Sequence, residues 1–166
     1  MKILTNPRNG TLLFFVISLA AILAALAFEH LGGYKPCPLC LQERYAYYAG
    51  LPLCAAALAA LSNDRPKWAL ILMAFAGLGF LINTGLGLYH SGIEWKFWAG
   101  PSTCSGGANL DESVGNLLEK LKTIKVIRCD EAPWRFIGLS FAGWSMIISF
   151  FLFLFSLNII KRLRNN

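Results

Sequence analysis

Four long stretches without a charged residue limit what this chain can fold into more than any other feature. They cover residues 11–28, 45–61, 68–93 and 136–160. A helix needs about 17–25 mostly apolar residues to cross the hydrocarbon core of a bilayer, and each stretch is long enough. The chain is also 56% hydrophobic, more than is usual for a soluble domain. We therefore predict an all-α membrane protein, a four-transmembrane-helix bundle that forms a single integral membrane domain over residues 1–166.

The expected helices cover about 11–30, 39–61, 67–89 and 136–160, which leaves loops of about 31–38 and 90–135 on one face. A stripe of apolar residues in the second loop predicts a short amphipathic helix over about 110–125. Its acidic residues fall in the first turn and its lysines in the last, as the helix dipole favours. Such a helix either lies along the membrane surface or packs on the rest of the loop, and the pattern leaves both open.

One asparagine and several glycines in the third stretch bear on how the helices pack against one another. Asn83 is expected to be a buried hydrogen-bonding group between helices. The glycines are expected to let neighbouring helices approach closely. They are Gly77, Gly79, Gly85 and Gly87.

Basic residues account for the net charge of +6, and their positions indicate the orientation of the bundle. All of this net charge lies at the two ends of the chain and in the turn after the second span, where Asp64 offsets one of seven positive charges. The seven are Lys2, Arg8, Arg65, Lys67, Lys161, Arg162 and Arg164. The positive-inside rule places these segments, and so both termini, in the cytoplasm. No nucleic-acid partner is needed to explain the charge. The first apolar run exceeds the length usual for a signal peptide, which favours a retained helix over a cleaved leader.

A Cys-x-x-Cys pair, Cys37 and Cys40, stands at the expected start of the second helix. Arg44 follows Cys40 by four residues and so shares its helical face. A helix N-terminus and a nearby guanidinium both favour thiolate over thiol, and thiolate is the reactive form. The pair is therefore a candidate redox centre.

Topology separates the five cysteines into two classes. Cys54 lies deep in the second span and is expected to be a buried packing residue. The other four lie on the outer side, and they allow three pairings, of which Cys37–Cys40 with Cys104–Cys129 is the simplest. A redox relay fits best, because a Cys-x-x-Cys loop is too small to add much stability and Cys104 and Cys129 lack the close spacing usual for zinc ligands. A structural disulfide and a four-thiolate zinc site stay open as alternatives, and no metal ligand is assigned.

A relay at this depth needs an electron acceptor, and a lipid-soluble quinone is the two-electron acceptor available there. Arg44 is a candidate to stabilise both the Cys40 thiolate and a developing quinol anion. His90 is a candidate to donate a hydrogen bond or proton to a quinone oxygen. The plainer alternatives are an interfacial anchor for Arg44 and a solvated histidine at a helix end for His90.

Motifs in the same order and topology resemble those of the DsbB family, membrane thiol oxidases that reoxidise a periplasmic thioredoxin-fold oxidase and reduce quinone. The resemblance spans about residues 28–144. The residues that carry it are Phe28-Glu29-His30-Leu31, Lys35-Pro36-Cys37, Leu39-Cys40, Glu43-Arg44, Tyr89-His90, Cys104, Cys129, Trp134, Phe136, Gly138, Leu139 and Trp144.

The resemblance implies a role for each outer cysteine. Cys104 is similar to the cysteine that the reduced partner attacks, and Cys129, once released, would attack Cys37. Cys40 would then be the thiolate that contacts quinone, assisted by Arg44 and His90.

The same resemblance implies surroundings and partners. It implies a bacterial cell inner membrane protein, multi-pass, with both termini cytoplasmic and the loops in the periplasm. Ubiquinone or menaquinone would be the cofactor, a DsbA-like oxidase the partner, and the lipid bilayer the medium.

Two other functions are weighed against this one. A vitamin K epoxide reductase-like thiol oxidase has similar chemistry, but that family usually places its two relay cysteines before the Cys-x-x-Cys pair, whereas here they follow it. A non-enzymatic tetraspan zinc-binding or scaffold protein would hold stoichiometric zinc on the four outer cysteines, which metal analysis would detect.

Overall fold

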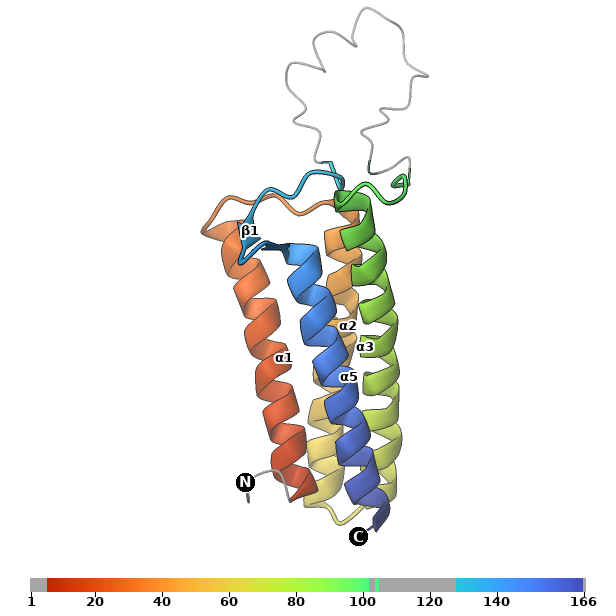
Figure 1. Cartoon of the computed structure of the whole chain (residues 1–166). Helices are drawn as coiled ribbons and strands as arrows, with labels where there is room; N and C mark the ends of the chain where they lie inside the picture. Colours follow the sequence, from red (N-terminus) through yellow and green to blue (C-terminus); the bar gives the residue numbers. More distant parts are fainter. Residues whose placement is uncertain (1–5, 102–103, 105–127, 166) are drawn as a thin grey trace, which may run out of the picture.

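The computed structural model of the chain describes residues 6–101, 104 and 128–165. Four helices stand side by side in a bundle, with the start of α1 and the end of α5 at the same end (Figure 1). All four are long and apolar enough to cross a membrane, which confirms the predicted four-helix membrane bundle. The helices are α1 (Pro7–His30), α2 (Pro38–Ser62), α3 (Pro66–Glu94) and α5 (Phe141–Asn165). The expected helix over 110–125 lies outside the described residues.

Proline is the first residue of α1, α2 and α3. This position suits proline, because its missing N–H would have no partner inside the helix and its φ is already helical. Asn6 caps α1 by accepting a hydrogen bond from the Arg8 backbone N–H at 2.9 Å. Cys37 caps α2 in the same way, since its Sγ accepts from the Cys40 backbone N–H at 3.2 Å. The fold therefore fixes the first cysteine of the Cys-x-x-Cys pair at a helix N-terminus.

The core of the bundle combines aromatic rings with a small polar cluster. Phe80 meets Phe14 and Tyr47 edge to face, with ring centroids 5.4 and 5.1 Å apart. The Asn83 side-chain amide donates to Ser149 Oγ at 2.8 Å and joins α3 to α5, which confirms its predicted interhelical role. Cys54 is fully buried and donates to the Thr11 carbonyl at 3.3 Å, as expected of a packing residue.

Of the four glycines that were expected to allow close helix approach, only two lie where another helix passes closely. A Cβ on Gly77 would clash with Ser156 Oγ, and one on Gly87 would lie 3.1 Å from the Met146 backbone; Ser156 and Met146 are both on α5. Gly79 and Gly85 face open space, so the expectation that they allow close approach is wrong. A glycine in a single sequence does not show whether its face of the helix packs against another helix.

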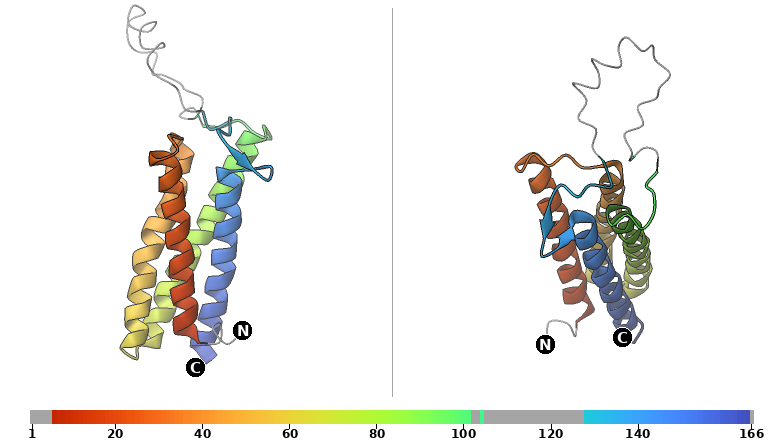
Figure 2. Two further views of the ribbon diagram at one scale, coloured as in Figure 1. Left: turned by 90° about the vertical axis from the view of Figure 1, so that its left-hand side faces the viewer. Right: turned by 45° about the horizontal axis from the view of Figure 1, so that its top comes forward.

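The fourth span begins at Phe141 and not at about 136, and a small hairpin precedes it. Strands β1 (Arg135–Phe136) and β2 (Leu139–Ser140) pair antiparallel, with Phe136 opposite Leu139. The two residues between them, Ile137 and Gly138, both have positive φ, of 52° and 80°. A right-handed helix cannot run through two such residues, whereas a two-residue hairpin turn needs them. Among the described residues, the protein is thus all-α except for this hairpin. The hairpin lies at the end where α1 ends and α2 begins, called the outer end below (Figure 2).

The third span also extends further than expected, to Glu94 and not to about 89. It ends where Lys96 adopts a positive φ of 63° and the Phe97 N–H turns back to the Gly92 carbonyl at 2.9 Å. His90 is therefore not a solvated residue at the helix end. A further helical turn follows it, and its side chain is buried.

Candidate redox site

The outer cysteines gather in one buried cluster at the outer end of the bundle. Cys37, Cys104 and Cys129 are each no more than 4% exposed and pack with Leu39 and Ile93. Cys104 and Cys129 form a disulfide. Cys37 and Cys40 are free thiols whose sulfurs lie 2.7 Å apart, so a disulfide between them needs little movement.

The two cysteine pairs meet at one point. The sulfurs of Cys37 and Cys129 and a ring nitrogen of His90 all lie within 4.8 Å of one another. Thiol–disulfide exchange requires one sulfur to attack another, and this separation allows it without rearrangement of the helices. Cys129 is already bonded to Cys104 and so offers no thiolate to a metal in this state. The arrangement suits electron transfer between two pairs better than zinc binding.

Cys37 lies in surroundings that favour its thiolate. Hydrogen bonds from the Cys40 side chain, from His90 at 3.5 Å and from the Cys40 backbone N–H outweigh the effect of burial and lower the pKa of Cys37 to about 5. Its place before the first turn of α2 acts in the same direction, as the sequence predicts. Cys37 is therefore ionised at neutral pH when the pair is reduced.

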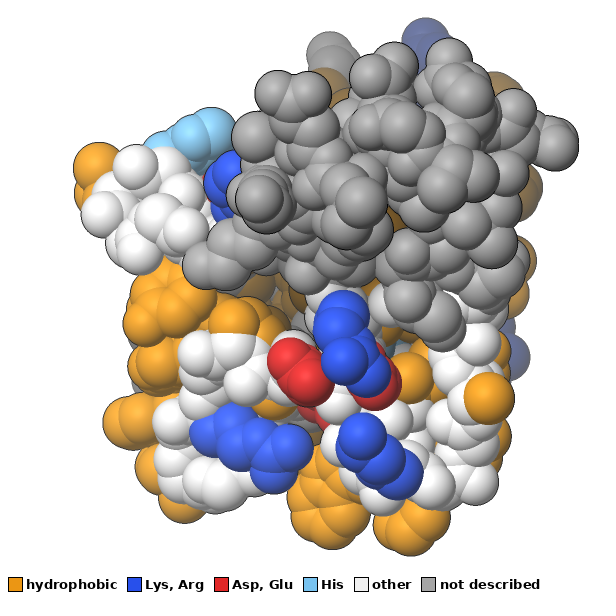
Figure 3. All heavy atoms as spheres, turned by 90° about the horizontal axis from the view of Figure 1, so that it is seen from above, with side chains coloured by type: hydrophobic (Ala, Val, Ile, Leu, Met, Phe, Trp, Pro, Cys, Tyr) orange, Lys and Arg blue, Asp and Glu red, His pale blue; other side chains and the backbone are white. Residues whose placement is uncertain are grey.

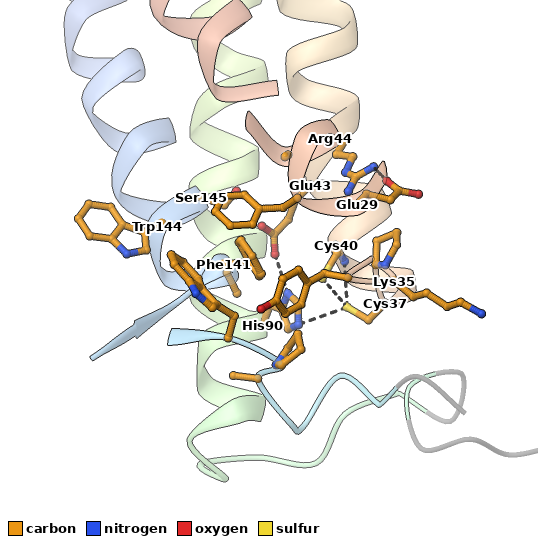
Figure 4. Close-up of a pocket in the computed structure, with 18 of the residues that line it drawn as sticks. Glu29, Lys35, Cys37, Cys40, Glu43, Arg44, His90, Phe141, Trp144 and Ser145 are labelled. Carbon is orange, nitrogen blue, oxygen red and sulfur yellow. Dashed lines mark hydrogen bonds and ion pairs between the residues drawn. The ribbon is translucent and has the colours of Figure 1, made fainter. Parts of the chain in front are cut away.

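His90 joins Cys37 to a buried carboxylate (Figure 4). Its Nδ1 lies 2.7 Å from Glu43 Oε1, and both side chains are at least nine-tenths buried. No role for Glu43 is predicted from the sequence above. A signal was present, because Glu43 is the only acidic residue of α2, and an ionisable residue within a membrane span is functional more often than not.

Arg44 lies on the far side of Cys40 from this cluster and pairs with Glu29, which joins α2 to the end of α1. Both side chains are largely buried. The four-residue spacing in the sequence predicts Arg44 on the helical face of Cys40, and in the structure both residues line one cavity. The sequence does not predict the pairing of Glu29 with Arg44, because the two residues belong to different helices.

This cavity has a volume of about 840 Å³ and is bounded by α1, α2, the end of α3, α5 and the segment that leads into the hairpin. Its aromatic part is a compact group of rings. Trp134 stacks on Phe141 with centroids 4.9 Å apart, and Phe28 meets Phe141 at 5.0 Å and Trp134 at 5.1 Å. A flat apolar ring fits between such side chains, with the Arg44 cation and the Cys40 sulfur in the same wall.

Acidic and basic side chains lie next to each other at the centre of the outer face, as Figure 3 shows. The ion pairs there involve the segment around Cys129. Asp130 pairs with Arg128 at 2.8 Å and with Lys96 at 3.7 Å, and Arg128 also reaches Glu131 at 3.4 Å. The Lys96 pair ties this segment to the end of α3, which helps to hold Cys129 over the site.

Comparison with known proteins gives one consistent result. The family model described as "Disulfide bond formation protein DsbB" matches residues 7–159. Disulfide bond formation protein B of Marinobacter nauticus is 30% identical, over 92% of this chain and 89% of its own. The protein of the same name from Histophilus somni is 29% identical, over 99% of this chain and 94% of its own.

No solved structure matches the chain. The similarity extends over nearly the whole sequence and includes both cysteine pairs, and it favours neither the vitamin K epoxide reductase-like reading nor the zinc-binding one. The chain belongs to the DsbB family and is a disulfide-generating membrane oxidoreductase.

Proposed function

We propose that this protein reoxidises a periplasmic thioredoxin-fold dithiol oxidase, of the DsbA type, and passes the two electrons to a membrane quinone. The observation that carries the proposal is the approach of Cys37 and Cys129 within 4.8 Å, which joins the two cysteine pairs into one path. Family membership supports disulfide formation, while the donor, the acceptor and the bacterial inner membrane are inferred.

The proposed order of exchange begins at Cys104. A thiolate of the partner attacks Cys104 and releases Cys129, which then attacks Cys37 of an oxidised Cys37–Cys40 pair. Cys40 leaves as a thiolate that carries both electrons of the broken bond. The second partner thiol then attacks the partner's own sulfur in the mixed disulfide, so the partner leaves oxidised and Cys104 leaves as a thiolate. Cys104 attacks Cys129 of the Cys129–Cys37 bond, which restores the Cys104–Cys129 disulfide and leaves Cys37 and Cys40 reduced, with both electrons at the outer end of α2.

The cavity residues fit a quinone ring. A bound quinone supplies a two-electron, two-proton acceptor. Phe28, Trp134 and Phe141 would hold the ring, Arg44 would bind one of its oxygens, and the Cys40 sulfur would face it. His90 lines the same cavity, but both of its ring nitrogens already have partners, so we assign the contact with a quinone oxygen to Arg44.

The test is quinone reduction by the full-length protein in detergent, with reduced DsbA as the donor and either ubiquinone-1 or menadione as the acceptor. Wild type should turn over, and Cys40→Ser and Cys104→Ser should both lose turnover. Cys54→Ser is the matched control, because Cys54 is buried away from the site and serine keeps the hydrogen bond to the Thr11 carbonyl. Turnover that survives Cys40→Ser would remove Cys40 from the acceptor step and refute the proposed path.

Arg44→Gln tests the assigned acceptor contact. The KM for the quinone should rise at least tenfold, since a charged hydrogen bond of about 1.5–3 kcal/mol is lost. The rate of the first exchange, measured as partner oxidation in a single turnover without quinone, should stay unchanged. An unaltered KM would separate Arg44 from the acceptor.

A further inference from the structure

His90 occupies a position that electron transfer between sulfurs does not explain. Its Nε2 lies 3.5 Å from Cys37 Sγ and its Nδ1 lies 2.7 Å from the Glu43 carboxylate. The three residues come from a loop and two helices, and each is no more than 5% exposed. A sulfur, an imidazole and a carboxylate in this order form the arrangement by which a general base, oriented by a third group, activates a nucleophile.

We propose that His90 is the proton acceptor for thiol exchange at Cys37, and that Glu43 is the positioning residue that orients and charges its ring. The proposal rests on the order of exchange given above, in which Cys129 attacks Cys37. It adds a base for that attack whenever the released Cys129 has taken up a proton, because only the thiolate is a nucleophile.

The step balances as follows. The thiol proton of Cys129 passes to His90 as Cys129 Sγ attacks Cys37 Sγ of the Cys37–Cys40 disulfide. The Cys129–Cys37 bond forms, the Cys37–Cys40 bond breaks, and Cys40 leaves as a thiolate with both electrons. Neutral groups thus become one imidazolium and one thiolate, with no proton exchanged with solvent.

The geometry supports each part of this step. The Cys129 sulfur and the His90 ring nitrogen lie within 4.8 Å, a separation that rotation of the released Cys129 side chain can shorten. Nδ1–H donates to Glu43, which leaves Nε2 to accept a proton while Cys37 is bonded to Cys40; once Cys37 is a free thiolate, the resulting Nε2–H donates to it. The Glu43 carboxylate then stabilises the imidazolium once it forms, in a site that excludes water and strengthens the pair.

Other groups that face His90 bear on its pH dependence. Elements α2, α3 and the outer segments contribute titratable groups around it, while α5 presents the neutral Ser145. These groups are Cys37, Cys40, Glu43, Glu94 and Cys129, with Glu29 and Arg44 paired to each other across the cavity.

Glu94 offers a matched control. It follows His90 by four residues on α3 and is a buried acid, and its Oε2 has no hydrogen-bond partner among the described residues. Glu94→Gln removes a nearby charge and keeps the Glu43–His90 hydrogen bond. The two acids therefore separate positioning of the ring from a general effect of negative charge.

The experiment isolates this one exchange in the full-length Cys104→Ser protein in detergent, without quinone or partner. Its Cys129 is a free thiol, so Cys37–Cys40 and Cys37–Cys129 disulfides interconvert within the molecule. The protein is equilibrated at pH 4 and jumped to values between about 5.5 and 9.5. Acid quench and peptide mapping then follow the approach of the Cys37–Cys129 population to its new value.

With His90→Gln in this background, the rate should fall about 100-fold at pH 6.5, because a thiol of pKa about 8.5 is only about 1% ionised there without a base. The deficit should vanish above about pH 9, where solvent ionises the thiol. Glu43→Gln should slow exchange by about tenfold, Glu43→Asp should recover part of that loss, and Glu94→Gln should keep the His90-dependent profile.

Imidazole rescue guards against a variant that merely distorts the site. His90→Gly should be slow and should recover when imidazole is added, which a structural role would not produce. A pH profile of His90→Gln parallel to that of wild-type His90, together with no rescue of His90→Gly, would overturn the proposal. Absence of any Cys37–Cys129 disulfide when His90 is intact would instead overturn the order of exchange itself.

Discussion

At the scale of single residues, Cys37 combines a structural and a chemical role. It caps α2 through its sulfur, and the same sulfur meets Cys40, His90 and, within 4.8 Å, Cys129. A capping sulfur is most effective as an acceptor when it is ionised. The need to begin a helix and the need for a reactive thiolate therefore favour the same protonation state.

This coupling predicts an acidic titration for Cys37. In the Cys104→Ser/Cys129→Ser protein with Cys37 and Cys40 reduced, the thiolate absorbance at 240 nm that is lost on Cys37→Ser should titrate with a midpoint near pH 5. Because the folded-state pKa is lowered from 9.0, the stabilisation by the thiolate is fully present above about pH 9 and is lost as pH falls through about 5. His90→Gln should raise the midpoint. A midpoint near the ordinary thiol value in the parent protein would contradict the hydrogen-bonded site.

The Glu29–Arg44 pair makes a second prediction at this scale. Either charge left alone in a largely buried position is destabilising. The losses of stability in the single variants Glu29→Gln and Arg44→Gln should therefore add up to more than the loss in the double variant. A double-mutant cycle of unfolding in mixed detergent micelles should give a coupling of about 1–2 kcal/mol. Additive effects would mean that the pair contributes nothing to holding α1 on α2.

How far the site could be read from the sequence depends on whether its contacts are local. Cys37, Cys40 and the helix start are neighbours in the chain, so their spacing alone predicted a reactive pair. Glu43 and His90 lie on different helices, and only the packing of α2 on α3 brings them together. The pattern of a single sequence does not show which residues of different helices are in contact. The free-energy cost of placing an acidic residue in a membrane span nevertheless marks Glu43 as a candidate functional residue.

At the scale of elements, uninterrupted apolar runs determine the spans because the bilayer demands about 20 residues of helix whatever their order. The hairpin before α5 depends on two backbone angles instead. Gly138 adopts a positive φ readily, but Ile137 is a β-branched residue that rarely does. The apolar character of Phe136 and Ile137 therefore suggested helix where the chain turns.

The packing of α3 on α5 predicts opposite results for two nearby glycines. Gly87→Ala should destabilise the protein by about 1–3 kcal/mol, because the new methyl group meets the Met146 backbone, which cannot rotate away. Gly85→Ala, two residues earlier, meets open space and should be neutral or gain up to about 1 kcal/mol from helix propensity. Thermal unfolding in detergent measures both. Equal effects would show that α3 and α5 are not in contact at Gly87.

At the scale of the whole molecule, the start of α1 and the end of α5 lie at one end of the bundle (Figure 1), and the cysteine cluster lies at the opposite end, where α2 begins. The positive-inside rule predicts that the side with the basic chain ends is the cytoplasm, and this orientation stays a prediction. Such an arrangement would expose the Cys104–Cys129 disulfide to an oxidising compartment, and the proposed quinone would carry the electrons away within the bilayer. It is the arrangement that the proposed function requires.

Fusion reporters test this orientation. Green fluorescent protein joined after Asn166 should fluoresce, and alkaline phosphatase joined after Gly100 should be active, because only the first is expected in the cytoplasm. Exchange of the two reporters should abolish both signals. Active alkaline phosphatase at the carboxyl terminus would reverse the assigned sides.

The segment from Cys129 to Trp134 is held at both ends, by the disulfide in the redox cluster and by the ring stack on Phe141. A chain so short has little slack, since each residue spans at most about 3.6 Å. Over evolutionary time, selection here is expected to act on the number of residues more strongly than on their identity. Replacing Ala132 keeps Cys129 where it is, whereas losing one residue would draw either the sulfur away from Cys37 or the ring out of the cavity. Homologous proteins should therefore differ in the residues of this segment but keep its length.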